Sequence, residues 1–221
     1  MVDGRDMVNF PINPLKPARA SKAMSFIIRS FKLVYDRLPG SYNGLVGALG
    51  YTAPELVVNA LAKREPFVGT VLDAGCGTGL TGEAIKQKFP DAKMSGFDLS
   101  PDMLGVARKT DLYTELKIAD ATLGLPFQHN QFDVAVSTGL YTLGHVGPEA
   151  LQPVLDCVKP GGYFALTVFD AAWDELAFDD AIQAMVADRQ IVVSSHDRQT
   201  HFGLTGQTCR VLVLQKCGAL N

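Results

Sequence analysis

A glycine-rich turn preceded by an acidic residue is the part of this sequence best suited to bind a ligand. The stretch reads Thr70-Val-Leu-Asp-Ala-Gly-Cys-Gly-Thr-Gly79, so an apolar, β-branched run leads into an acid and three alternate glycines. Glycines leave no Cβ between backbone N–H groups and a ligand. A helical pattern follows the last glycine, and a helix N-terminus favours an anionic group.

The acid before the turn, Asp73, narrows the ligand class. A dinucleotide site presents its glycine turn to a pyrophosphate, which a neighbouring carboxylate would repel. A carboxylate together with a helix N-terminus suits a ligand whose cationic and anionic ends lie close together, such as an amino acid.

Two further acids stand where strands are predicted to end. Residues 93–97 predict a strand that delivers Asp98, and residues 116–119 predict one that delivers Asp120. Ligands of open α/β sheets bind at the carboxyl ends of the strands. Asp98 could therefore accept hydrogen bonds from both hydroxyls of a ribose, or it could simply cap a helix.

These stretches resemble the class I S-adenosylmethionine-dependent methyltransferases, whose first motif reads acid-x-Gly-x-Gly-x-Gly. The likeness covers about residues 50–170. A narrower likeness, to methyltransferases of the Williams–Beuren-region type and the related tetratricopeptide-associated methyltransferases, rests on Tyr51-x-Ala-Pro54 and Asp98-Leu-Ser-Pro-Asp-Met-Leu104. The resemblance implies S-adenosylmethionine as cofactor and S-adenosylhomocysteine as product.

The resemblance also implies roles for single residues. Asp120 and the backbone N–H of Ala121 are expected at the adenine edge, although Asp120 could be only a turn former. Leu99 and Met103 either enclose the adenine or belong to the core. The candidate cofactor-binding residues are Asp73, Gly75, Cys76, Gly77, Gly79, Asp98, Leu99, Met103, Asp120, Ala121, Ser137 and Thr138.

The loop after the predicted strand 132–137 holds the candidate catalytic residues, His145 and Tyr141. An imidazole has an ordinary pKa of about 6.5, which suits a base near neutral pH. Positioning alone could also suffice for methyl transfer. We expect the acceptor pocket to include residues 139–147, Trp173 and the N-terminal segment. No metal-ligand spacing is present.

Strand and helix patterns alternate after residue 64, which predicts an α/β fold with a doubly wound, mostly parallel sheet. Two β-branched stretches, 191–195 and 209–215, are expected to pair antiparallel because no helix pattern separates them. The resemblance implies seven strands with an antiparallel last strand. Residues 51–221 are expected to form the S-adenosylmethionine-binding domain.

Residues 1–50 are expected to form an extension with a helical lid. An amphipathic pattern over 21–37 includes Phe26 and Phe31, and a break is predicted at 39–44. A second helix is predicted from Thr52, where Thr52-Ala-Pro-Glu55 has capping-box spacing.

Composition places the chain among ordinary folded proteins, with 47% hydrophobic and 19% charged residues out of 221. No apolar run approaches the roughly 20 residues that cross a bilayer, and the four cysteines lack C-x-x-C spacing. The expected location is cytoplasmic.

The charge of the chain is unevenly distributed. Residues 1–40 have a net charge of +4 and the remainder −7. The expected acceptor is therefore a small molecule, with neither nucleic acid nor membrane as a partner; the oligomeric state stays open.

Two other functions are compatible with the pattern. Gly77-Thr-Gly-Leu-Thr-Gly82 satisfies G-x-G-x-x-G, which would suit an NAD-dependent oxidoreductase. Asp73, Gly75 and Asp120 argue against that function. A non-catalytic S-adenosylmethionine-binding protein is the other alternative.

Overall fold

The computed structural model describes residues 39–64 and 69–218, and of residues 39–42 it describes only the backbone. The predicted lid helix over 21–37, with Phe26 and Phe31, lies outside the described residues. The same holds for the side chain of Tyr42, which was expected to contribute to the lid. The division into an extension and a binding domain therefore stays a prediction.

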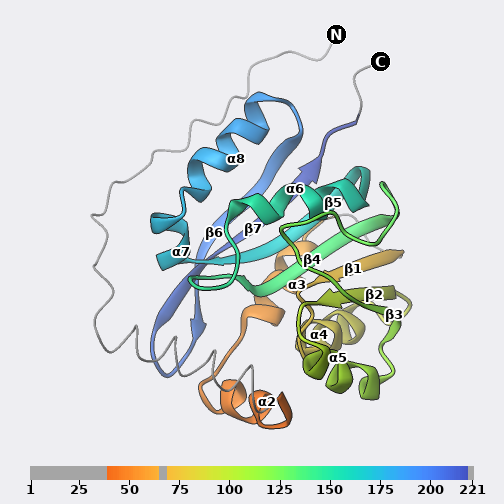
Figure 1. Cartoon of the computed structure of the whole chain (residues 1–221). Helices are drawn as coiled ribbons and strands as arrows, with labels where there is room; N and C mark the ends of the chain where they lie inside the picture. Colours follow the sequence, from red (N-terminus) through yellow and green to blue (C-terminus); the bar gives the residue numbers. More distant parts are fainter. Residues whose placement is uncertain (1–38, 65–68, 219–221) are drawn as a thin grey trace.

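A seven-stranded sheet in the order β3-β2-β1-β4-β5-β7-β6 runs through the molecule (Figure 1). Neighbouring strands pair in parallel except for β7, which is antiparallel to both β5 and β6. This confirms the predicted α/β fold with its antiparallel last strand. The strands are β1 (Thr70–Ala74), β2 (Lys93–Asp98), β3 (Tyr113–Ile118), β4 (Phe132–Tyr141), β5 (Val158–Phe169), β6 (Ile191–Phe202) and β7 (Gln207–Lys216).

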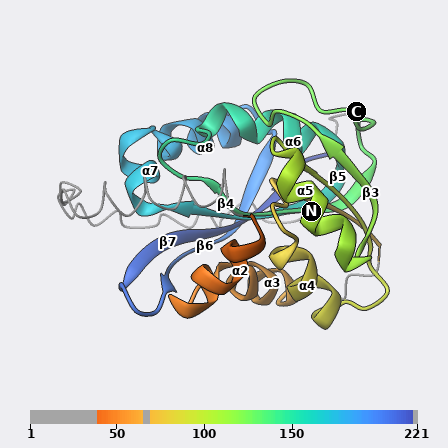
Figure 2. The ribbon, with the colours of Figure 1, turned by 60° about the horizontal axis from the view of Figure 1, so that its bottom comes forward.

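Helices cover both faces of this sheet. Figure 2 shows α3 and α4 on one face and α6, α7 and α8 on the other, while α5 packs beside β2 and β3 and also contacts α2. The helices are α2 (Pro39–Ala48), α3 (Ala53–Ala62), α4 (Leu80–Lys88), α5 (Pro101–Ala107), α6 (Leu151–Cys157), α7 (Asp170–Glu175) and α8 (Phe178–Ala187). None of the described helices is long and apolar enough to cross a membrane.

Burial on both faces explains the apolar runs in the sequence. In β1, Val71 packs into the layer of α3 and α4, and the adjacent Leu72 packs into the opposite layer. Both side chains are fully buried. A strand covered on two sides has no solvent-facing position, so it reads as a continuous apolar stretch.

Two segments differ from the predicted secondary structure. Residues 39–44 are helical in α2 rather than a break, since Pro39 at the first position has no N–H to lose. The strand β5 begins at Val158, five residues earlier than expected. Gly162 allows this close pairing, because a Cβ there would lie 2.5 Å from the carbonyl oxygen of Asp133.

Other boundaries shift in smaller ways. The strand β3 starts at Tyr113 rather than 116, and β4 continues to Tyr141 rather than ending at 137. The helix α3 confirms the predicted helix from Thr52, but the threonine hydroxyl lies 3.5 Å from the carbonyl of Thr200 and makes no cap hydrogen bond. The capping-box prediction was therefore wrong. Ser100 does cap α5, accepting a hydrogen bond from the N–H of Met103 at 3.3 Å.

Lys216 joins the end of α6 to the sheet. Its ammonium group donates hydrogen bonds to the carbonyls of Leu155 and Val158, both at 2.8 Å, and to Asn130 Oδ1 at 2.9 Å. Carbonyls at the end of a helix have no partner within it, and the helix dipole favours a cation there. Partial burial lowers the pKa of this lysine.

We predict that Lys216→Met lowers the free energy of unfolding by about 1–2 kcal/mol, because the helix-end carbonyls lose a charged donor. Chemical denaturation measures this change. The exposed Lys93, at the start of β2, offers a matched control, and Lys93→Met should change stability by less than about 0.5 kcal/mol. Equal effects of the two substitutions would contradict the capping role.

Candidate active site

Two adjoining cavities open at the carboxyl ends of the central strands. The larger one has a volume of about 360 Å³ and the smaller one about 70 Å³. Both are lined by Gly75, Asp98, Leu140 and His145. The larger cavity adds Phe97, Leu99, Ser100, Ala119, Asp120, Ala121, Gly144 and Val146. The smaller one adds Tyr51, Cys76, Gly77, Thr78, Leu80, Thr81, Thr138 and Gly139.

The glycine turn separates the end of β1 from α4 and forms one wall of both cavities. Gly75, Gly77 and Gly79 have φ angles of +69°, +54° and +100°, a region that costs other residues strain. A Cβ on Gly75 would also lie 3.0 Å from Leu140. Only glycine therefore allows the turn to approach the end of β4 this closely.

Asp98 ties this turn to the end of β2. One carboxylate oxygen accepts a hydrogen bond from the Gly77 N–H and the other from the Ser100 N–H, both at 2.9 Å. The side chain is 5% exposed and lines both cavities. The prediction that Asp98 faces the ligand site is consistent with this placement, and the carboxylate also organises the loop around it.

The residues predicted for the adenine come together in the larger cavity. Leu99, Asp120 and Ala121 all line it. One oxygen of Asp120 accepts hydrogen bonds from the Thr122 hydroxyl at 2.7 Å and from its N–H at 2.8 Å. These bonds lower the pKa of Asp120 below its ordinary value. Asp120 is thus a turn former and a cavity residue at once.

Asp73 lies beneath the turn rather than in a cavity, which corrects the expectation that it meets the ligand directly. Its side chain is fully buried, and one oxygen accepts a hydrogen bond from the Tyr113 hydroxyl at 2.7 Å. Burial raises the pKa of Asp73 to about 7; the Tyr113 hydrogen bond lowers it and the charge of Asp98 raises it further. The strand alternation explains the placement, because the side chain next to Leu72 points to the opposite face.

Met103 and Ser137 are also placed outside the cavities. Met103 is fully buried in α5 and is therefore a core residue, one of the two roles considered for it. Ser137 is fully buried as well, and its hydroxyl donates to the carbonyl of Ala74 at 2.8 Å. This bond joins β4 to β1 just before the turn, so Ser137 supports the site from behind.

Tyr141 is a core residue, which corrects its assignment as catalytic. Because β4 extends to this position, the fully buried ring packs edge-on against Phe178, with centroids 5.7 Å apart. Its hydroxyl donates to the carbonyl of Ala150 at 3.1 Å. Trp173, expected at the acceptor pocket, lines neither cavity and instead stacks on Phe178.

His145 stands at the junction of the two cavities, as the prediction of a ligand-facing loop requires. Its Nδ1 lies 3.4 Å from the carbonyl oxygen of Gly139. Thr138, also predicted, lines the smaller cavity and shares a 2.7 Å hydrogen bond with the hydroxyl of Thr81 on α4. The C-terminal part of β4 is therefore attached to the helix that follows the glycine turn.

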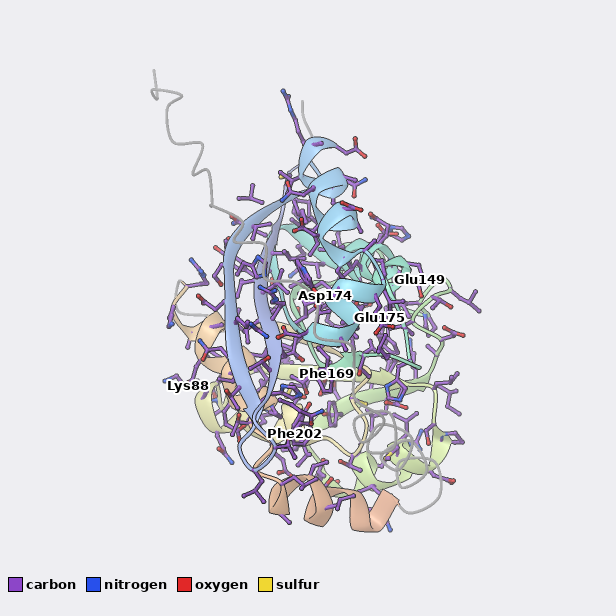
Figure 3. All side chains as sticks on the ribbon, turned by 90° about the vertical axis from the view of Figure 1, so that its left-hand side faces the viewer. Lys88, Glu149, Phe169, Asp174, Glu175 and Phe202 are labelled. Atoms are coloured by element: carbon purple, nitrogen blue, oxygen red, sulfur yellow. The ribbon has the colours of Figure 1, made fainter. Side chains whose placement is uncertain are left out.

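Tyr51 was missed as a site residue. It lines the smaller cavity, and a Cβ on Gly139 would lie 3.1 Å from its hydroxyl. Its ring packs on Phe202, 4.9 Å away between centroids. Figure 3 shows Phe169 and Phe202 one above the other beside the β6–β7 hairpin, with α2 below them. The Tyr51-x-Ala-Pro54 pattern contributed to the family resemblance, but it did not predict that Tyr51 lines a cavity.

Asn43 connects α2 to the turn, since its Oδ1 accepts a hydrogen bond from the Thr78 hydroxyl at 2.5 Å. The segment before the glycine motif is therefore in contact with the site. The Tyr42-Asn43 pair is one of the features shared with the narrower methyltransferase family, but it predicted no contact with the turn, and a break rather than a helix was predicted for the segment that carries it.

The cavity residues fit S-adenosylmethionine. Gly75 and Gly77 line the smaller cavity with backbone alone, so no side chain of theirs occupies it. Acids at the ends of β2 and β3, Asp98 and Asp120, line the same cavity. They match the hydrogen-bond donors of a ribose and of an adenine amine, and the volume is within the range of small-molecule sites.

Comparison with known proteins identifies the kind of domain. Residues 71–162 match the methyltransferase-domain family. The chain carries a class I S-adenosylmethionine-dependent methyltransferase domain. It is 30% identical over 147 residues to trans-aconitate 2-methyltransferase of Streptomyces avermitilis, covering 62% of this chain and 53% of that protein. It is 40% identical over 67 residues to 18S rRNA (guanine(1575)-N(7))-methyltransferase of Saccharomyces cerevisiae, covering 30% and 24%.

Solved structures share the methyltransferase fold. A TehB-like S-adenosylmethionine-dependent methyltransferase from Corynebacterium glutamicum superposes with a TM-score of 0.61 at 19% identity, covering 84% of this chain and 99% of that one. A chain from a complex with the Haloferax volcanii Trm112 methyltransferase activator gives 0.62 at 18% identity, covering 85% and 98%. This chain spans only about a quarter to a half of the length of the curated relatives that it matches.

The methyltransferase assignment makes S-adenosylmethionine the cofactor. It also disfavours the NAD-dependent alternative for Gly77-Thr-Gly-Leu-Thr-Gly82. Gly82 lines neither cavity, so the last glycine of that pattern needs an explanation other than a pyrophosphate.

The buried carboxyl of Asp73 predicts a pH-dependent stability. Its folded-state pKa of about 7 lies above the ordinary 3.8, so its contribution is full below pH of about 4 and is lost as the pH rises through about 7. In Asp73→Asn the amide resembles the protonated acid. Between pH of about 5.5 and 8, the wild-type protein should lose roughly 2 kcal/mol of unfolding free energy relative to this variant. Urea denaturation at both pH values measures the difference, and parallel pH profiles would contradict it.

Proposed function

We propose that this protein transfers the methyl group of S-adenosylmethionine to a small-molecule acceptor. The observation that carries the proposal is the pair of adjoining cavities beside the glycine turn. Among the described residues, neither lining contains a lysine or an arginine. Proteins that bind nucleic acid neutralise its phosphates mainly with these two residues.

Charge supports the same acceptor class. From residue 41 onward the chain has a net charge of −7, which opposes a polyanion. The relatives include a trans-aconitate methyltransferase and also 18S rRNA methyltransferases. The acceptor class proposed here therefore follows from the site's own chemistry rather than from the relatives' names.

The proposed cofactor site uses the two ends of the larger cavity. Asp98 would accept from the ribose hydroxyls, and Asp120 with the N–H of Ala121 would meet the adenine edge. The N–H groups of the turn would face the methionine carboxylate. When bound, S-adenosylmethionine supplies an electrophilic methyl group on its sulfonium.

The proposed acceptor side lies where His145 and Tyr51 converge on Gly139. His145 can remove a proton from an acceptor that becomes nucleophilic only after losing it. Tyr51 offers a hydroxyl to an acceptor oxygen, and its ring is fixed by Phe202. Holding the acceptor in line with the methyl group could supply much of the rate without any base.

Asp98→Ala should weaken S-adenosylmethionine binding by about 10- to 150-fold, because a charged acceptor of hydrogen bonds is worth roughly 1.5–3 kcal/mol. Isothermal titration calorimetry measures the affinity. Asp102 on α5 is exposed and lines neither cavity, so Asp102→Ala is the matched control and should bind normally. Unchanged affinity in the Asp98 variant would remove this residue from the site.

A screen for methyl transfer tests the acceptor class. Wild-type protein with radiolabelled S-adenosylmethionine should methylate a member of a panel of small acids, phenols and amines, and should leave total RNA unlabelled. Labelled RNA would overturn the small-molecule proposal. Cofactor binding without transfer to any panel member or RNA would favour the non-catalytic alternative.

Once an acceptor is known, His145→Gln distinguishes a general base from a residue that only lines the cavity. We expect turnover to fall by about 10²-fold or more, as removal of a general base does, while S-adenosylmethionine affinity changes less than about twofold. His129 lines neither cavity, so His129→Gln is the control. If turnover and its pH profile survive in the His145 variant, catalysis is by proximity.

A further inference from the structure

Tyr113 occupies a space beneath the glycine turn that no sequence motif predicts. It is the first residue of the edge strand β3, and its hydroxyl donates to Asp73 at 2.7 Å. A Cβ on Gly82 would overlap this hydroxyl, and a Cβ on Gly79 would lie 3.4 Å from the ring. The absence of a side chain at Gly82 therefore leaves the space that the phenol occupies, whereas Gly79 is in ordinary van der Waals contact with the ring.

This fit explains the G-x-G-x-x-G pattern without a dinucleotide. Gly77 lines the smaller cavity, whereas Gly82 lies within α4 and is buried. Glycine inside a helix costs about 1 kcal/mol relative to alanine. The Tyr113 ring supplies a reason for that cost, since any side chain at Gly82 would displace it.

The Asp73 carboxyl is incompletely satisfied. Within the described part of the chain, its Oδ1 is buried and has no hydrogen-bond partner, so Tyr113 is the donor seen on this group. The other titratable groups that act on this cluster are Asp98 on β2, which raises the pKa of Asp73, and Cys76 in the turn, whose own pKa burial raises. Arg108 acts on Cys76. Burial therefore disfavours the ionised form of Asp73, and the hydrogen bond from Tyr113 is the described contact that favours it.

We propose that Tyr113 is a positioning residue of the cofactor site: seated against Gly82, it holds the Asp73 carboxyl beneath the turn so that its negative charge favours the cationic end of S-adenosylmethionine. The inference rests on the proposed placement of this cofactor at the turn. Sulfonium and ammonium groups give the ligand a net positive charge, which a buried anion attracts strongly because solvent screens it little.

The positive charge of the ligand determines how its affinity changes with pH. A bound cation stabilises the ionised carboxyl, so binding near pH 7 releases a proton from Asp73 and becomes tighter as the pH rises. In Tyr113→Phe the hydrogen bond that lowers the pKa is lost. Asp73 then stays protonated to higher pH, and the rise in affinity moves to higher pH with it.

The test is calorimetric titration of S-adenosylmethionine between pH of about 6 and 8.5, in buffers of different ionisation enthalpy that reveal proton release. At pH 7 we expect Tyr113→Phe to bind about 3- to 10-fold more weakly than wild type, corresponding to up to one pKa unit, and to release more protons. Asp73→Asn should lose this proton release and its pH dependence, and adding Tyr113→Phe to it should change little.

Tyr163→Phe is the matched control, because Tyr163 is a partly buried tyrosine of β5 that lines neither cavity. It should leave affinity and proton release unchanged. If Tyr113→Phe fails to fold, the Asp73→Asn arm still decides the matter, since unchanged proton release there overturns the inference. If the wild-type protein binds S-adenosylmethionine and Tyr113→Phe has the same pH profile of affinity, this inference is overturned and the proposed function is not. A wild-type protein that binds no S-adenosylmethionine overturns the proposed function as well.

Discussion

The close approach of three strand ends at one glycine turn is the constraint on which the site depends. The N–H of Gly77 donates to Asp98 at the end of β2, and Gly75 leaves room for Leu140 near the end of β4. Both glycines have positive φ, a conformation that other residues adopt only with strain. The cavities exist because the turn can lie this close to its neighbours.

Two buried acids, Asp98 and Asp73, have different environments around this turn. Asp98 is held by two backbone N–H groups and reaches both cavities, whereas Asp73 is sealed beneath the turn with a phenol as partner. The two environments differ, because Asp98 accepts two backbone N–H bonds at the cavities, whereas Asp73 lines neither cavity and burial raises its pKa. Two acids at the ends of neighbouring strands are therefore placed differently relative to the cavities.

The proposed acceptor side is built by segments far apart in the chain. Tyr51 precedes α3, His145 follows β4, and the ring of Tyr51 rests on Phe202 from the β6–β7 hairpin. The hairpin thereby supports a side chain at the cavity although it is distant from the glycine motif. The shape of the smaller cavity therefore depends on how elements distant from the glycine motif pack.

The sequence by itself determined the α/β class, the strands in their order along the chain, and the acids at the carboxyl ends of β1 and β2, although it missed the helix α2. These follow from local signals: apolar runs, glycine at positive φ, and Ser100 capping α5. Only the tertiary structure decided which side chains reach the cavities. Strand alternation and the extra residues of β4 turned Asp73 and Tyr141 into the interior, and packing between distant segments brought Tyr51 and Tyr113 to the site. Those contacts depend on neighbours many residues away, which no local spacing encodes.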